Sequence, residues 1–318
     1  MENNHSLRPK KLENFIGQEN IKEQIAIHIE SAKIREENLN HFLFYGPAGL
    51  GKTSLAKVIS EEMGGDLHVV LATSIKEKYE VLSILLNLKK GDFLFIDEIQ
   101  SLPRELQEMF YSAMEDFNIE LQVNEEFQTI QFEPFTLIGA TTNLSKLTKP
   151  MRDRFYHVYK LEYYSISELE KIIEQMASLK NNSIEKDACF EIAIRSKKTP
   201  RVAIRYLLTI RNFELSINKS ENIKKETVLN AFKRLGVDEL GLTAEEREVL
   251  KSMLINHNDK PVGPTSLSMS ANIEEEDFLK IIEPFLIQQN LIIRGKRGRT
   301  LTDLGREHIK KQLELISK

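Results

Sequence analysis

Two short motifs carry side chains suited to binding and hydrolysing a nucleoside triphosphate. The first is Gly46-Pro47-Ala48-Gly49-Leu50-Gly51-Lys52-Thr53, which has the form G-x-x-x-x-G-K-[ST]. The mostly apolar residues 41–45 before it predict a buried strand, and residues 54–59 after it predict a helix. Between them, backbone N–H groups and the helix N-terminus would surround phosphate oxygens, with Lys52 on the β- and γ-phosphates and Thr53 on Mg²⁺. A glycine-rich surface loop is the alternative, but it would not explain the flanking strand and helix.

The second motif is Phe93-Leu94-Phe95-Ile96-Asp97-Glu98, in which four apolar residues precede two acids. This order predicts a buried strand with both carboxylates at its C-terminal end, the edge at which open parallel sheets bind ligands. We expect Asp97 to hold Mg²⁺ through its water shell and Glu98 to orient or deprotonate the attacking water. The sequence contains no Asn-Lys-x-Asp motif of the guanine-reading type, which favours ATP.

The composition is that of an ordinary globular protein, with 318 residues, 41% hydrophobic content and a net charge of −4. This length predicts two or three domains. The negative charge argues against general coating of nucleic acid but allows a local basic patch. The single cysteine, Cys189, excludes an intrachain disulfide and lies in a helical pattern typical of a core position. Because no segment approaches a membrane span and the N-terminus lacks a signal sequence's apolar region, we expect a cytoplasmic protein.

Three successive patterns predict three domains. In residues 1–164, apolar strands alternate with amphipathic helices, as in a parallel α/β sheet. Alternating residues between Phe117 and Phe135 predict a β-hairpin inserted in that domain, which either fills space at its edge or grips a partner. Residues 165–235 are helical in pattern and predict a small lid. Residues 238–318 predict three helices, the last over 274–289, followed by a hairpin, which is the plan of a winged helix.

The predicted wing carries four cations around two glycines: Arg294, Lys296, Arg297 and Arg299. Cations on such a turn can approach a phosphate backbone closely and position a protein on DNA without reading its sequence. A charge run is often only a solvated face, but its place in a DNA-binding type of fold favours DNA contact. We expect Arg294 and Arg299 to matter most because they bracket the turn.

The chain resembles the AAA+ ATPases and, most closely among them, the RuvB family of bacterial motors that drive Holliday junction branch migration. The resemblance is nearly end to end. It rests on the order and spacing of Leu7-Arg8-Pro9-Lys10, Phe15-Ile16-Gly17-Gln18, Tyr45-Gly46-Pro47, Met114-Glu115-Asp116-Phe117, Pro134-Phe135-Thr136-Leu137-Ile138-Gly139-Ala140-Thr141-Thr142, Met151-Arg152-Asp153-Arg154-Phe155, Thr199-Pro200-Arg201 and Glu283-Pro284-Phe285-Leu286-Ile287-Gln288-Gln289. It implies an α/β fold: an AAA+ P-loop parallel sheet with an inserted β-hairpin, a small helical lid and a C-terminal winged helix.

The resemblance also implies roles for single residues. Thr142 would be the polar sensor of the γ-phosphate or the water, and Arg201 would report the nucleotide state to the lid. Arg154 would be an arginine finger inserted into a neighbouring subunit's site, and Arg152 is close enough in sequence to share that task. Because both arginines flank Asp153, a surface ion pair is the alternative.

Leu7, Arg8, Phe15 and Ile16 would line the adenine pocket. The full set of implied ATP contacts is Leu7, Arg8, Phe15, Ile16, Gly49, Leu50, Gly51, Lys52, Thr53, Ser54, Glu115, Asp116, Phe117, Arg154, Tyr164, Pro200 and Arg201.

The partners implied by the resemblance are double-stranded DNA at four-way junctions, five further copies of the chain in a hexameric ring, a RuvA-like junction-binding protein that grips the hairpin, and a RuvC-like resolvase. The implied setting is recombination and the repair of DNA damage, including the SOS response. Three positions depart from the family pattern: the short hairpin tip Asn124-Glu125-Glu126 lacks the usual Gly-Pro, Gln100 replaces a histidine and Asn143 replaces an arginine.

Three other functions are compatible with these motifs. One is a switch ATPase on DNA, similar to a clamp loader or an initiator, that turns over slowly. Another is a protein-remodelling ATPase, for which the basic wing would be idle. The third is a scaffold that does not hydrolyse ATP. Sustained hydrolysis stimulated by DNA separates the motor from all three.

Overall fold

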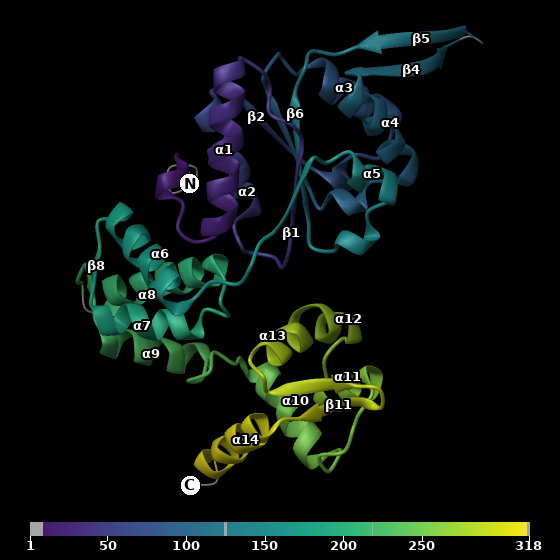
Figure 1. Cartoon of the computed structure of the whole chain (residues 1–318). Helices are drawn as coiled ribbons and strands as arrows, with labels where there is room; N and C mark the ends of the chain where they lie inside the picture. Colours follow the sequence, from purple (N-terminus) through teal and green to yellow (C-terminus); the bar gives the residue numbers. More distant parts are fainter. Residues whose placement is uncertain (1–8, 124–125, 218, 317–318) are drawn as a thin grey trace. The chain divides into compact units, whose positions relative to one another are not determined.

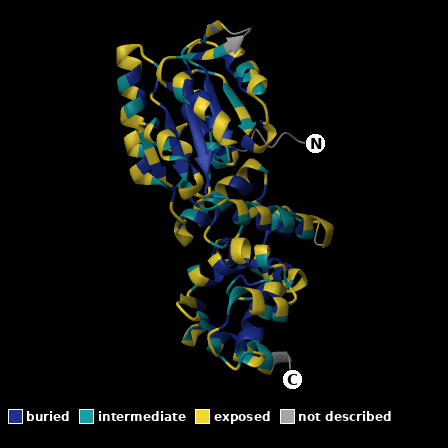
Figure 2. Ribbon diagram, turned by 90° about the vertical axis from the view of Figure 1, so that its right-hand side faces the viewer, coloured by how far each residue is buried: buried dark blue, intermediate teal, exposed yellow. Residues whose placement is uncertain are grey.

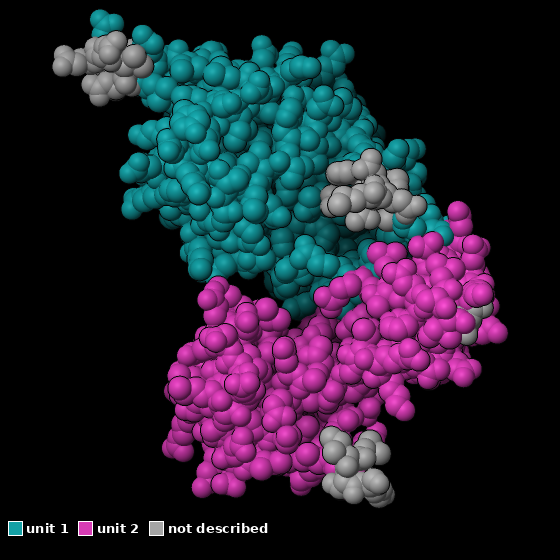
Figure 3. Space-filling model, turned by 180° about the vertical axis from the view of Figure 1, so that it is seen from behind, with its two compact units in different colours: residues 1–180, 199–204 teal, residues 181–198, 205–318 magenta. Residues whose placement is uncertain are grey.

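The computed structural model describes residues 9–123, 126–217 and 219–316. The chain divides into two compact units, residues 1–180 with 199–204 and residues 181–198 with 205–318 (Figure 3). The residues predicted as a lid are therefore shared between the units, because the segment up to residue 180 and the turn at 199–204 group with the first one. No helix in the described part of the chain is both long enough and apolar enough to cross a bilayer.

The first unit is built on a parallel sheet of five strands in the order β2-β3-β6-β1-β7. These strands are β1 (Phe42–Tyr45), β2 (Leu67–Leu71), β3 (Phe93–Asp97), β6 (Thr136–Thr141) and β7 (His157–Lys160). The inner strands are apolar and buried, whereas β2 and β7 at the edges are partly exposed (Figure 2). Because parallel strands end at the same edge, the residues that follow β1, β3 and β6 gather there. The predicted α/β fold is confirmed.

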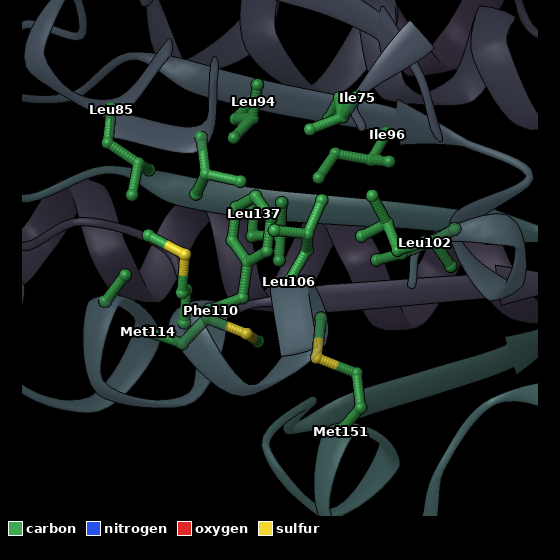
Figure 4. Packing of buried hydrophobic residues seen from close by; sticks show 14 of the residues in the cluster. Ile75, Leu85, Leu94, Ile96, Leu102, Leu106, Phe110, Met114, Leu137 and Met151 are labelled. Carbon is green, nitrogen blue, oxygen red and sulfur yellow. The ribbon is translucent and has the colours of Figure 1, made fainter. Parts of the chain in front are cut away.

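Helices cover the sheet of the first unit (Figure 1). They are α1 (Glu19–Arg35), α2 (Lys52–Met63), α3 (Lys78–Leu86), α4 (Arg104–Glu115), α5 (Lys149–Asp153) and α6 (Ile166–Leu179), with short 3₁₀ turns η2 (Leu12–Asn14), η3 (Ala72–Ser74), η4 (Ile99–Ser101) and η5 (Leu144–Lys146). Helix α4 is anchored by Leu106, Phe110 and Met114, which pack on Leu94 and Leu137 of the sheet (Figure 4). Buried apolar contact of this extent fixes the helix rigidly, since protein interiors pack densely.

The predicted hairpin is present. Strands β4 (Asn118–Val123) and β5 (Glu126–Gln131) pair antiparallel and extend away from the sheet (Figure 1). Ile119 is buried, and Leu121 and Ile130 pack against the core of the first unit, so the base of the hairpin is tied to the domain. At the tip, Asn124 and Glu125 lie outside the described residues.

The second unit contains the remaining helices and three short strand pairs' worth of backbone. The lid part holds β8 (Ser183–Ile184), α7 (Lys186–Arg195), the later turns of α8 (Pro200–Ile217), β9 (Asn222–Ile223) and α9 (Lys225–Leu235). The winged-helix part holds α10 (Ala244–Ile255), α11 (Pro264–Ala271), α12 (Glu275–Asp277), the π-helix η6 (Phe278–Ile282), α13 (Glu283–Gln288), β10 (Ile292–Gly295), β11 (Gly298–Leu301) and α14 (Asp303–Ile316). Leu250, Leu267, Phe278 and Leu286 belong to its core.

The winged-helix prediction is confirmed with two differences. The helix predicted over 274–289 is three pieces, with a π-helical stretch at 278–282. Pro284 follows that stretch and has no N–H to donate along the helix, which favours a local change of hydrogen-bond pattern. Helix α14 after the wing was not predicted, because the residues after Leu301 carry few apolar side chains.

Candidate active site

The phosphate loop lies between the end of β1 and the start of α2. Gly46, Gly49 and Gly51 have φ angles of 137°, 84° and 100°, a region in which side chains are strained. A Cβ on Gly49 would lie 2.9 Å from Cβ of Arg201. Glycine is therefore required here both by backbone conformation and by space, as expected for a loop that wraps phosphate groups.

Lys52 is the first residue of α2 and is only 7% exposed. Its Nζ donates hydrogen bonds to the carbonyl oxygens of Gly46 (2.7 Å) and Pro47 (2.9 Å). Burial lowers the pKa of Lys52, while the charges of Glu98 and Asp97 act in the opposite direction. The ammonium group is thus held inside the loop, beside the acids at the end of β3.

Glu98 and Thr142 meet at the same edge of the sheet. Glu98 adopts a left-handed conformation (φ 50°) directly after β3. Its Oε2 accepts hydrogen bonds from Thr142 Oγ1 (2.8 Å) and from Gln100 Nε2 (2.5 Å). The strands bring the predicted catalytic acid and the predicted sensor together, although 44 residues separate them.

Gln100 and Thr142 hold Glu98 in its charged form. Burial alone would raise the pKa of Glu98, but hydrogen bonds from Gln100 and Thr142, together with the charge of Lys52, bring it below its usual value. An amide does not titrate, so this support is independent of pH. Glu98 is therefore a carboxylate, the form needed to accept a proton from water.

We expect Gln100→Leu to raise the pKa of Glu98, because the carboxylate loses a hydrogen bond while it stays partly buried. The carboxylate form is lost as the pH falls through this pKa, so the acidic limb of kcat for ATP hydrolysis should move to higher pH. The measurement is kcat against pH at saturating ATP, with the exposed neighbour Ser101→Ala as control. An acidic limb that stays in place would remove Gln100 from this role.

A pocket of about 310 Å³ adjoins these groups. It is lined by Ala48, Gly49, Gly51, Lys52, Thr53, Ser54, Asp97, Glu98, Pro200, Arg201 and Ile204. The N–H of Arg201 donates to the carbonyl oxygen of Gly49 at 3.3 Å. A larger hollow of about 910 Å³ lies between α8 and α9, but it has no phosphate loop, so the smaller pocket is the candidate site.

Two predicted adenine contacts pack on the phosphate loop. Phe15 is buried, and its ring would lie 3.1 Å from a Cβ on Gly51. Tyr164 is also buried and donates its hydroxyl to the carbonyl oxygen of Leu50 at 3.2 Å. Ile16 is half-buried. Leu7 and Arg8 lie outside the described residues.

Four of the predicted ATP contacts are not among the described residues that line this pocket: Glu115, Asp116, Phe117 and Arg154. Glu115, Phe117 and Arg154 line a different hollow of about 660 Å³ in the same unit. Arg152 is half-buried near them in sequence. The chain therefore has a phosphate pocket and a separate arginine-bearing surface. Sequence reasoning missed Ala48 and Ile204 as lining residues, since neither carries a polar side chain.

The wing presents three of its four cations. Arg294, Lys296 and Arg297 are exposed. Arg299 is not: its guanidinium donates to Glu283 Oε1 at 2.5 Å and Oε2 at 3.1 Å, and the two side chains are 7% and 5% exposed. The expectation that Arg299 stands on the surface beside Arg294 is therefore corrected, because the ion pair with α13 encloses it.

We expect Arg299→Ala to lower the free energy of unfolding by about 3–5 kcal/mol, since it leaves the charge of Glu283 buried without a partner. Arg294→Ala with Arg297→Ala should change stability by less than about 0.5 kcal/mol, because both side chains are exposed. The same pair should reduce the salt dependence of DNA affinity by about two phosphate contacts.

The measurements are urea unfolding and DNA affinity at several salt concentrations. Arg299→Met combined with Glu283→Leu is the control, because removing both charges should recover most of the lost stability. An Arg299→Ala protein of unchanged stability that nevertheless loses salt dependence would contradict this assignment.

Three family models match successive parts of the chain. The Holliday junction DNA helicase RuvB P-loop domain matches residues 7–161, the RuvB AAA lid domain matches 164–238, and the RuvB C-terminal winged helix domain matches 239–310. A curated Holliday junction branch migration complex subunit RuvB from Fervidobacterium nodosum is 41% identical over 309 residues, covering 96% of this chain and 89% of its own length.

A protein of the same description from Thermotoga maritima is 39% identical over 308 residues, covering 96% of this chain and 92% of its own length. The solved structure of the Thermotoga maritima RuvB Holliday junction branch migration motor superposes with a TM-score of 0.84 at 39% identity, over 96% of this chain and 98% of that one.

Proposed function

Because the chain belongs to the RuvB family of AAA+ ATPases, we propose that it is a motor that uses ATP hydrolysis to move the branch point of Holliday junctions. The observation that carries this proposal is the meeting of Lys52, Glu98 and Thr142 at one sheet edge, in a pocket that Arg201 also lines. A binding module would need the loop but not a catalytic acid held in its charged form beside a sensor.

In the proposed reaction the loop N–H groups and Lys52 hold the phosphates of ATP. Glu98 orients the attacking water and accepts its proton, and Thr142 contacts the water or the γ-phosphate. Thr53 and Asp97 line the same pocket and offer the oxygen ligands that Mg²⁺ prefers. No group of three His, Cys, Asp or Glu side chains in the described residues could hold a metal without the nucleotide. Bound Mg²⁺ would neutralise charge on the β- and γ-phosphates.

Arg154 is the proposed arginine finger, and it acts on the ATP of a neighbouring subunit. Support comes from its place outside the lining of the phosphate pocket of its own chain. Glu115, Asp116 and Phe117, which lie at the end of α4, would contact that neighbouring nucleotide as well. Such an arrangement makes hydrolysis depend on assembly of a ring, which we propose to be a hexamer.

We propose three domains: an ATPase domain (1–164), a lid (165–235) that Arg201 couples to the nucleotide, and a winged helix (238–318). Arg294, Lys296 and Arg297 would contact the phosphates of duplex DNA, while Arg299 shapes the wing. The hairpin β4–β5 would bind a RuvA-like junction-binding protein, with a RuvC-like resolvase in the wider complex. DNA as the substrate places this activity in the cytoplasm.

The test is steady-state ATP hydrolysis with and without a four-way DNA junction. A motor should hydrolyse many ATP molecules for each binding event and should be stimulated by the DNA. One turnover per binding event would favour a switch ATPase, and indifference to DNA would favour a protein-remodelling ATPase. Absence of hydrolysis would leave only a scaffold.

A further inference from the structure

The side chain of Arg154 is held in place by α4. Its guanidinium carbon lies 4.5 Å from the centre of the Tyr111 ring, within the range of a cation–π contact. One terminal nitrogen donates to the carbonyl oxygen of Pro150 at 3.0 Å, and the other donates to Glu115 at 3.3 Å. Tyr111 and Glu115 are one helical turn apart, so the direction of the guanidinium depends on where α4 lies.

A chain of hydrogen bonds continues behind Tyr111. Thr148 Oγ1 lies 2.9 Å from the Tyr111 hydroxyl and donates to Gln107 Oε1, also at 2.9 Å. Because Thr148 has one proton and gives it to Gln107, the Tyr111 hydroxyl is the donor to Thr148. Gln107 is 3% exposed, and its Nε2 donates to the carbonyl oxygen of Leu102 at 2.9 Å. Water cannot easily replace partners that are buried in this way. We call Gln107, Thr148 and Tyr111 the polar chain.

The polar chain ends at the turn that carries the catalytic acid. Leu102 caps η4, the single 3₁₀ turn that starts immediately after Glu98. Gln100, inside that turn, donates to Glu98. One short turn of backbone therefore contacts Glu98 at its beginning and anchors the polar chain at its end.

We propose that Gln107, Thr148 and Tyr111 are positioning residues that fix the arginine finger Arg154 and tie it to the turn carrying Glu98 of the same subunit. This inference rests on the proposed role of Arg154 in the neighbouring site. A shift of η4 during hydrolysis would move the anchor of the polar chain, and with it the finger that serves the next ATP. Coupling through contiguous hydrogen bonds is a physical route between two sites.

Mixed rings separate this role from a merely structural one. An Arg154→Ala subunit keeps its ATP site but has no finger. A Lys52→Ala subunit supplies a finger but has no working site. Co-assembly of the two, checked by pull-down of one tagged subunit, should restore hydrolysis at Arg154→Ala sites that receive a finger from a Lys52→Ala neighbour.

Thr148→Val is then added to one subunit at a time, because valine keeps the shape of threonine but neither donates nor accepts. In the Lys52→Ala subunit, which donates the finger, it should lower the restored kcat by about tenfold to a hundredfold, the cost of misplacing a catalytic group by about 1 Å. In the Arg154→Ala subunit, which has no finger, it should cause no further loss.

Tyr111→Phe should reproduce the same asymmetry, since it removes the hydroxyl and keeps the ring. The exposed Tyr79→Phe is the matched control and should have no effect in either subunit. Equal losses in both placements, or no loss in either, would overturn the polar chain and leave the finger intact. Failure of the parent mixture to hydrolyse ATP despite co-assembly would instead overturn the finger in the neighbouring site, and this inference with it.

Discussion

Arg154→Ala is expected to lower kcat for ATP hydrolysis by about 10³- to 10⁵-fold, the range over which arginine fingers act. The physical reason is that the guanidinium neutralises charge that develops on the transferred phosphoryl group. ATP affinity should change little, because Arg154 does not line the phosphate pocket of its own chain in the described residues. The measurements are steady-state hydrolysis and equilibrium binding of ATP.

The matched control for Arg154 is Arg104→Ala, which removes an arginine of 82% side-chain exposure at the start of α4. This variant should keep full turnover. If Arg154→Ala also kept its turnover, Arg154 would have no catalytic part and the ion pair with Glu115 would be its function. A variant that lost ATP binding instead of turnover would place the side chain at its own subunit's nucleotide.

The second large effect is expected for Glu98→Gln, which should lower kcat by about 10²- to 10⁴-fold, the usual contribution of a general base. Glutamine has the shape of glutamate and can still accept a hydrogen bond from Thr142, but it cannot take a proton from water. The variant should therefore bind ATP and retain it unhydrolysed, which gel filtration followed by analysis of the bound nucleotide would reveal.

Glu105→Gln, an exposed change on α4, is the control for the loss of a carboxylate. Turnover unchanged in Glu98→Gln would exclude Glu98 as the catalytic acid of the site, whatever its contacts with Gln100 and Thr142. Loss of ATP binding would mean that the carboxylate supports the loop rather than the reaction.

The parts of the site that could be predicted from the sequence are those that local backbone chemistry dictates. Three glycines in left-handed conformations and a lysine at the start of a helix are needed by any loop that wraps phosphates. The strand ending in Asp97 and Glu98 is similarly readable, because a short apolar run followed by charge leaves little choice of placement. The meeting of Glu98 with Thr142 follows once both strands are assigned to one parallel sheet.

Other features depend on contacts between distant segments and left no local signal. Arg299 looks like a surface cation until Glu283, 16 residues away on α13, encloses it. The polar chain joins Gln107 to Thr148 across 41 residues, and neither residue belongs to a nucleotide motif. Strand β7 is only four residues long and has polar residues at both ends, so its pairing with β1 decides it and its own sequence does not.

The central claim, that this chain is a branch migration motor, is tested most directly by ATP-dependent separation of a synthetic four-way junction into duplex arms. The reaction is run with and without the RuvA-like protein of the same source, with Lys52→Ala as control. The account predicts separation that needs ATP, that increases with the junction-binding protein and that is lost in Lys52→Ala. Active ATP hydrolysis without junction separation under any of these conditions would contradict it.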